Sequence, residues 1–204
     1  MLDFKELQDK ADKSLVNNVP SPKLVSFIYI LLLASLVLVD YFFFKMSLII
    51  NIVVAFFAIF LTVGLNWYCL RVSRNENPPL TTLIEPFKHF FKVFSLSLII
   101  LVLTVVFGLL LIIPGIIVAI KLSQAFNIIH DNPKTGIIDA LKESNKLMKG
   151  RVMEYVKLNF SLLPWVIMIF ASGGMIILYV IPICKITGSN YYNSVSCELA
   201  NATC

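Results

Sequence analysis

Few side chains in this sequence have the type and spacing that catalysis requires. Its two histidines are His89 and His130, and His130 directly precedes Asp131. A carboxylate in that position can orient an imidazole that acts as a general base. The alternative is that the pair ends a helix before Asn132–Pro133, because proline disfavours helical backbone in the residue before it. We favour the helix end, since the sequence lacks hydrolase, phosphate-loop and paired-carboxylate motifs. We predict no catalytic residue, cofactor or metal, and no enzyme.

Lys121 is the ionisable residue of greatest interest, because it lies inside a long apolar stretch. An ionisable group at membrane depth is a functional candidate by default. If Pro114–Gly115 forms an outer turn, Lys121 lies about 9 Å along the helix from that turn. Asp40 ends another apolar stretch at comparable depth, so we hypothesise an Asp40–Lys121 ion pair. The alternative is that Lys121 extends to the outer headgroups.

Two further sets of residues could carry chemistry. The cysteines lack metal-binding spacing; a Cys197–Cys204 disulfide is possible in an extracytoplasmic tail, but we favour unpaired thiols for Cys69, Cys184, Cys197 and Cys204. Polar amides also occur in or near the apolar stretches, and we expect them to form hydrogen bonds between helices rather than a permeation path. These amides are Asn51, Asn66, Gln124, Asn127 and Asn159.

The composition places these residues in a membrane protein. Of 204 residues, 58% are hydrophobic and 14% are charged, whereas soluble domains are nearer half apolar and a quarter charged. The net charge of +5 comes from lysines and arginines that lie between apolar stretches. That distribution is typical of cytoplasmic loops facing anionic headgroups, so we expect the lipid bilayer as a partner and no nucleic acid.

The pattern predicts an all-α integral membrane protein with about six spans in three hairpins, five spans being the alternative. A cytoplasmic amphipathic leader over 1–23 precedes a single polytopic domain over 24–204. The spans are expected at about 24–44, 47–70, 93–113, 115–130, 152–171 and 174–190.

Charge decides how the third and fourth spans cross. A single crossing by 93–120 would put the basic segments 71–92 and 121–157 on opposite sides, against the positive-inside rule. An outer turn at Pro114–Gly115 keeps both segments cytoplasmic, and proline and glycine suit a turn. The returning segment 115–130 would be only about 24 Å long as a helix, so neighbouring helices must shield it or it crosses only partway.

Residues 135–149 form a second amphipathic segment. Ile137, Ile138, Leu141 and Met148 share one face at helical spacing, with charged residues on the other. Thr135 is expected to cap the start of this cytoplasmic helix and Gly150 its end.

Several stretches of the sequence resemble those of a known family. The stretch LLLIIPGIIVAIKLSQAFNIIHDNPKTGIIDALKESNKLMKG at 109–150 is similar to the signature of the domain of unknown function 975 family, as are KELQDKADKSLVNN at the start, NPPLTTLIEPFKHF at 77–90 and KLNFSLLPW at 157–165. The family consists of small multi-span membrane proteins, mostly of Gram-positive bacteria. It is distantly like membrane domains found beside glycerophosphodiesterases. The tail departs from the family pattern at Ile181–Ile183 and Ser189–Cys204.

The resemblance implies a fold and a bacterial plasma membrane, but no function. We expect a multi-pass protein with a cytoplasmic N-terminus that is non-enzymatic and acts through protein or lipid partners, as an accessory, stress or bacteriocin-immunity factor, or as a homo-oligomer. The alternative is a component of a small-solute or lipid transporter or channel. Pro114, Gly115, Lys121, Asp40, Asp131 and Gly150 are the candidate structural or functional residues.

Overall fold

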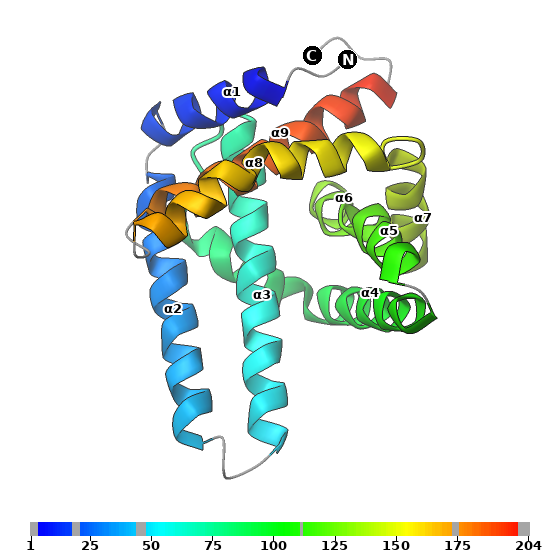
Figure 1. Cartoon of the computed structure of the whole chain (residues 1–204). Helices are drawn as coiled ribbons and strands as arrows, with labels where there is room; N and C mark the ends of the chain where they lie inside the picture. Colours follow the sequence, from blue (N-terminus) through cyan, green and yellow to red (C-terminus); the bar gives the residue numbers. More distant parts are fainter. Residues whose placement is uncertain (1–3, 18–20, 44–47, 111, 173–175, 200–204) are drawn as a thin grey trace.

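The computed structural model describes residues 4–17, 21–43, 48–110, 112–172 and 176–199. All regular structure in these ranges is helical (Figure 1). This confirms the predicted all-α class. The elements are α1 (Phe4–Asn17), α2 (Pro22–Phe43), α3 (Leu48–Ser73), the 3₁₀ helix η1 (Leu80–His89), α4 (Phe90–Leu110), α5 (Ile112–Leu122), α6 (Ala125–Asp131), α7 (Ile137–Leu147), α8 (Val152–Ala171) and α9 (Ile177–Leu199).

The first two apolar segments form the antiparallel pair α2 and α3 (Figure 1). Pro22 begins α2, where the first backbone N–H groups lack helical partners and proline costs nothing. The N-terminal half of α3 exposes Ile52, Val53 and Phe57. Its other half is buried, with Trp67 and Tyr68 among the largest enclosed side chains. Helix α3 therefore leaves the packed part of the molecule at one end.

The chain reverses between α4 and α5, as the charge pattern predicts, but not at Pro114–Gly115. Helix α4 ends at Leu110 and α5 begins at Ile112. Pro114 and Gly115 therefore lie in the first turn of α5. Proline is tolerated there because its missing N–H would be unpaired anyway. Gly115 has a different role: a Cβ at this position would lie 2.7 Å from the Cα of Gly108. The glycine therefore allows the two helix backbones to touch.

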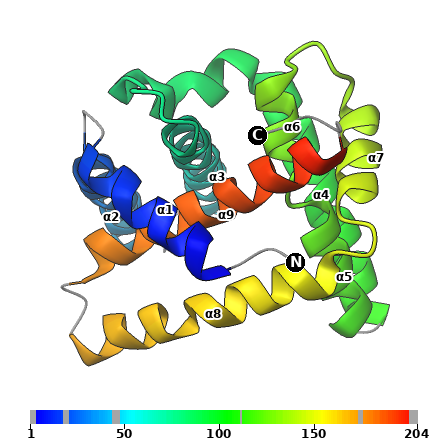
Figure 2. The same ribbon diagram turned by 90° about the horizontal axis from the view of Figure 1, so that it is seen from above.

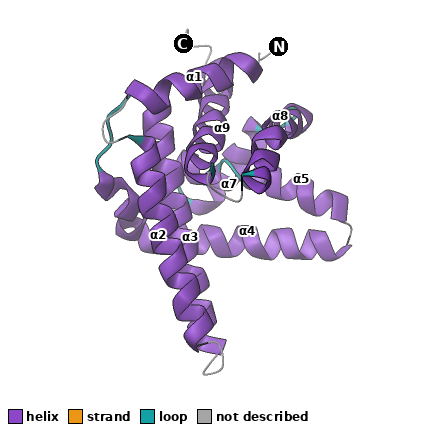
Figure 3. Cartoon of the chain, turned by 60° about the vertical axis from the view of Figure 1, so that its left-hand side comes forward, coloured by secondary structure: helices purple, strands orange, loops and turns teal. Residues whose placement is uncertain are grey.

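The described helices do not confirm a count of six spans. Three stretches are long and apolar enough to cross a membrane, namely Asn51–Ser73, Leu80–Leu109 and Val152–Ile169, and Pro22–Leu38 is a shorter apolar helix. The predicted span 115–130 is divided into α5 and α6 by a turn at Ser123–Gln124. The eleven residues of α5 make about 16 Å of helix, well short of the thickness of a hydrocarbon core. Helix α4 also runs across the axes of α2 and α3 rather than along them (Figures 1 and 3).

Helix α1 packs its apolar face against the protein. In α1, Leu7, Ala11 and Leu15 are buried. Helix α1 lies across α9 in the view from above (Figure 2), and the Asn190 side chain donates a hydrogen bond to the Leu7 carbonyl at 3.2 Å. The apolar face that the sequence predicts for the leader is therefore covered.

Helix α7 corresponds to the predicted amphipathic segment 135–149 and packs against α5 and α6. Its start differs from the prediction, because Gly136 rather than Thr135 occupies the N-cap and no side chain caps it. Gly150 follows the helix with a φ of 78°, in the left-handed region that glycine adopts without strain. The helix itself ends at Leu147 with Met148 as its C-cap, so Gly150 lies two residues beyond the cap rather than forming it.

Candidate functional site

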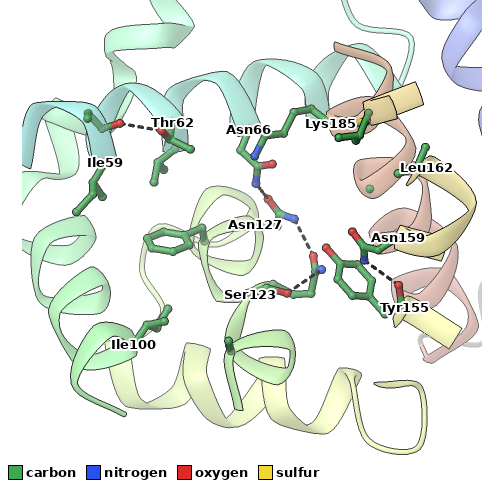
Figure 4. Close-up of a pocket in the computed structure, with 18 residues that line it drawn as sticks. Ile59, Thr62, Asn66, Ile100, Ser123, Asn127, Tyr155, Asn159, Leu162 and Lys185 are labelled. Carbon is green, nitrogen blue, oxygen red and sulfur yellow. Dashed lines mark hydrogen bonds between the residues drawn. The ribbon is translucent and has the colours of Figure 1, made fainter. Parts of the chain in front are cut away.

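A cavity of about 730 Å³ lies among six helices, α3 to α6, α8 and α9 (Figure 4). This volume is in the range of pockets that hold small organic ligands. The cavity is lined by Ala58, Ile59, Thr62, Val63, Asn66, Ile100, Ala119, Ser123, Gln124, Phe126, Asn127, Tyr155, Asn159, Leu162, Val166, Cys184, Lys185 and Gly188.

A chain of amide hydrogen bonds forms the polar wall of this cavity. Asn66 of α3 donates to the Asn127 side-chain oxygen at 2.8 Å, and Asn127 donates to that of Gln124 at 2.9 Å. Gln124 in turn donates to the Ser123 hydroxyl at 3.3 Å. We call Asn66, Asn127 and Gln124 the amide chain. Gln124 precedes α6 because the α5–α6 turn falls at Ser123–Gln124, so this turn positions the wall.

The amide chain confirms the predicted hydrogen bond between helices for Asn66 and Asn127, and Gln124 joins them. The other two amides behave differently. Asn159 bonds within its own helix, donating to the Tyr155 carbonyl at 2.8 Å. The buried side-chain oxygen of Asn51 has no hydrogen-bond partner among the described residues.

Lys185 carries the only charge among the described residues that line the cavity. It lies on α9, and its side chain extends toward Asn66 (Figure 4). Within the described part of the chain, its ammonium group has no hydrogen bond or ion pair. Sequence reasoning missed Lys185 and singled out Lys121. The available signal was a single lysine within the predicted span 174–190, between residues that are otherwise uncharged.

The cavity reaches the surface between α3 and α8 through apolar side chains. Ile59 and Val166 line it from these two helices and are both 40% exposed. Ile59 and Ile100 lie at the end of the cavity opposite Lys185 (Figure 4). The cavity is thus amphipathic, with amides and one ammonium group at one end and aliphatic side chains at the other.

A second polar grouping, outside the cavity, joins the end of α3 to α6 and α9. The Arg74 guanidinium donates to both carboxylate oxygens of Asp131 at 2.7 and 2.8 Å, and the Tyr192 hydroxyl donates to Asp131 at 2.9 Å. Arg71 pairs with Glu85 at 3.1 Å. We call these five residues the arginine cluster.

The charges of this cluster shift the pKa of Asp131. Partial burial acts to raise that pKa, but hydrogen bonds from His130 and Arg74 outweigh it, so the pKa lies below its usual range. Burial, followed by the nearby Asp131 charge, raises the pKa of Tyr192. Asp131 is therefore an ionised acceptor that holds α3 and α9 together.

The family of the chain is given by comparison with known proteins. Residues 96–198 match the family described as a protein of unknown function, DUF975. The chain belongs to this family. The matched part runs from α4 to α9 and includes the α5–α6 turn and Lys185. No curated protein and no solved structure matches the chain. The distant likeness to membrane domains beside glycerophosphodiesterases receives no support from these comparisons.

In this DUF975 protein, Lys121 lies away from the large cavity. It lines a smaller cavity of about 330 Å³ between α5 and α7, together with Lys142 and Asn145. The carbonyl of Lys121 accepts a hydrogen bond from the Ser144 hydroxyl at 2.7 Å, which ties α7 to α5. The side chain of Asp40 lies outside the described residues, so the Asp40–Lys121 pair stays a prediction.

The DUF975 chain also places the histidines and cysteines. His130 ends α6 as expected, accepts a hydrogen bond from Arg71 Nε at 3.2 Å and lies 5.1 Å from the Trp67 ring. Cys69 and Cys184 are free thiols, as favoured, whereas Cys197 is disulfide-bonded, contrary to our preference. Among the described residues, no group of three or more histidine, cysteine or acidic side chains could hold a metal ion.

Proposed function

We propose that this chain is a non-enzymatic integral membrane protein that acts by binding a lipid-like molecule in the cavity. The observation that carries the proposal is the amphipathic lining of that cavity, with amides and Lys185 at one end and the aliphatic side chains of Ile59 and Ile100 at the other, where Ile59 is partly exposed (Figure 4). Pockets of this kind bind a ligand by its apolar body and fix its orientation with a few polar groups.

The apolar surface supports the placement in a membrane. Large aliphatic and aromatic side chains are exposed along α2, α4 and α8, examples being Leu31, Phe91 and Ile167. Soluble monomers rarely expose contiguous apolar patches of such extent. We propose a multi-pass protein of a bacterial plasma membrane whose N-terminus is cytoplasmic, since the lysine-rich segments then lie on the cytoplasmic side.

A lipid-like partner is favoured over a docked protein. The amphipathic helices α1 and α7 were candidate docking surfaces, but the apolar face of α1 packs against α9, and α7 packs against α5 and α6 and leaves Ile138 exposed. Transport of the bound molecule is the second candidate function. It is favoured by the turn at Ser123–Gln124, because broken helices often build the binding sites of transporters.

The test of binding compares two glycines. A Cβ at Gly188, which lines the cavity, meets no atom within 4 Å, and the same holds for Gly108 on α4, which does not line it. Gly188→Leu should therefore place a bulky side chain in the cavity and obstruct it without disrupting the fold, while Gly108→Leu leaves the cavity open. The purified protein, stripped of lipid in mild detergent, is offered a total bacterial lipid extract and analysed by native mass spectrometry.

We expect lipid adducts on the parent and on Gly108→Leu, and their loss on Gly188→Leu. Adducts that persist on Gly188→Leu would contradict the proposal, as would a parent protein that binds nothing. Membrane insertion is checked separately: the protein should remain in the membrane pellet after an alkaline carbonate wash. Release into the supernatant would refute that part of the proposal.

A further inference from the structure

The state of Lys185 indicates which lipid-like molecules the cavity accepts. Its ammonium group faces the cavity without a counter-ion among the described residues. An unpaired charge that is partly removed from water is costly, and a partner of opposite charge relieves that cost. A ligand with an anionic head would supply the missing partner, whereas a cationic head would repel Lys185.

The amide chain adds neutral donors beside this charge. Each side-chain NH₂ group has two hydrogens, and Asn66 and Asn127 each use one on the next member of the amide chain. Their second hydrogens are available to oxygen atoms of a bound head, whereas the Gln124 side chain bonds to Ser123 and Tyr155. The described lining has no further cation to neutralise a second negative charge. These donors therefore suit a head with several oxygens and one negative charge.

The aliphatic end limits the rest of the ligand. A cavity of about 730 Å³ must hold both the head and the part of the chain that precedes the opening. Ile59 and Ile100 offer only aliphatic contact in this part. One acyl chain can lie along these residues and leave through the opening toward the bilayer.

We propose that the ligand is a single-chain amphipath with one negative charge, of the long-chain carboxylate type, whose head lies between Lys185 and Asn66. The proposal rests on the proposed function and adds the sign of the charge and the orientation of the ligand. The head enters the protein, and the tail faces lipid.

The experiment measures equilibrium binding of radiolabelled palmitate to the detergent-solubilised, delipidated full chain, with three competitors. Hexadecanol is the neutral analogue of the same chain, hexadecyltrimethylammonium is the cationic one, and lysophosphatidylglycerol has a phosphodiester as its single negative charge. Because charge-assisted hydrogen bonds are the strong ones, we expect palmitate to bind about tenfold or more tightly than hexadecanol. The cationic amphipath should not compete, and lysophosphatidylglycerol competes if the phosphodiester is the natural head.

Variants assign the effect to Lys185. Lys185→Gln should lose the preference for palmitate over hexadecanol while still binding hexadecanol, and Lys185→Arg should restore the preference. Lys121→Gln, which removes a lysine from the other cavity, is the matched control and should behave as the parent. If the parent binds hexadecanol and palmitate equally, or if Lys185→Gln weakens both alike, this inference is overturned while the proposed function stands. If no amphipath binds, both fail.

Discussion

Replacing Gly115 by alanine tests whether the close contact of α4 and α5 holds the reversal in place. The added Cβ would lie 2.7 Å from the Cα and 2.8 Å from the N of Gly108, both backbone atoms that cannot move aside as a side chain would. Overpacking costs about 1–3 kcal/mol, and backbone contact places this case near the upper value. Alanine offsets up to about 1 kcal/mol of that cost through its helix propensity. We expect Gly115→Ala to lower the free energy of unfolding by about 2 kcal/mol.

Gly108 provides the matched control on the opposite helix. A Cβ at this position meets no atom within 4 Å, so Gly108→Ala gains helix propensity without a clash. It should raise the free energy of unfolding by up to about 1 kcal/mol. The two variants then differ by about 3 kcal/mol, more than a hundredfold in the folding equilibrium. Unfolding in detergent micelles titrated with sodium dodecyl sulfate, followed by circular dichroism, measures both. Equal stability of the two variants would refute the role assigned to Gly115.

Two further predictions concern the end of α7 and the arginine cluster. Gly150→Ala should lower the midpoint of thermal unfolding, because an alanine in the left-handed region costs about 1–2 kcal/mol. Gly150→Asn should lower this midpoint less, since asparagine adopts that region more readily. Equal midpoints for the two variants would argue against a left-handed backbone at residue 150. The pKa of Asp131 is lowered in the folded state, so the ionised carboxylate stabilises the fold fully at pH 7. This stabilisation is lost as the pH falls below about 4, the usual value for an aspartate, and through the lower folded pKa. Asp131→Asn should therefore be less stable than the parent at pH 7, and this difference in melting midpoint should shrink at acid pH; a constant difference down to pH 3 would show that the Arg74 pair does not depend on the Asp131 charge.

The sequence predicts those features of the fold that depend on local chemistry. The charge distribution and Pro114–Gly115 indicate a reversal near residue 114, and the structure has it between α4 and α5. The period of residues 135–149 predicts α7, and Asn132–Pro133 marks the end of α6 at Asp131. In each case the signal lies within a few residues of the feature.

The sequence does not predict which faces of the apolar helices meet. Segments such as α4 are apolar on all sides, so no periodicity distinguishes a face in contact with lipid from one in contact with protein. For the same reason Lys185, 64 positions beyond Lys121 and surrounded by uncharged residues, shows no sign of facing Asn66 and Asn127. The cavity depends on contacts between distant segments, which a single sequence does not reveal.

The packing of α1 on α9 has a consequence for how the chain is made. The hydrogen bond from Asn190 to the Leu7 carbonyl joins residues 183 positions apart. At ordinary rates of translation, the ribosome needs roughly 10–40 s to add that length. Throughout this interval Leu7, Ala11 and Leu15 lack the part of their cover that α9 supplies, although α2 and α3 are made early. During synthesis the apolar face of α1 is thus only partly covered, and the membrane surface can shield the rest until α9 is made.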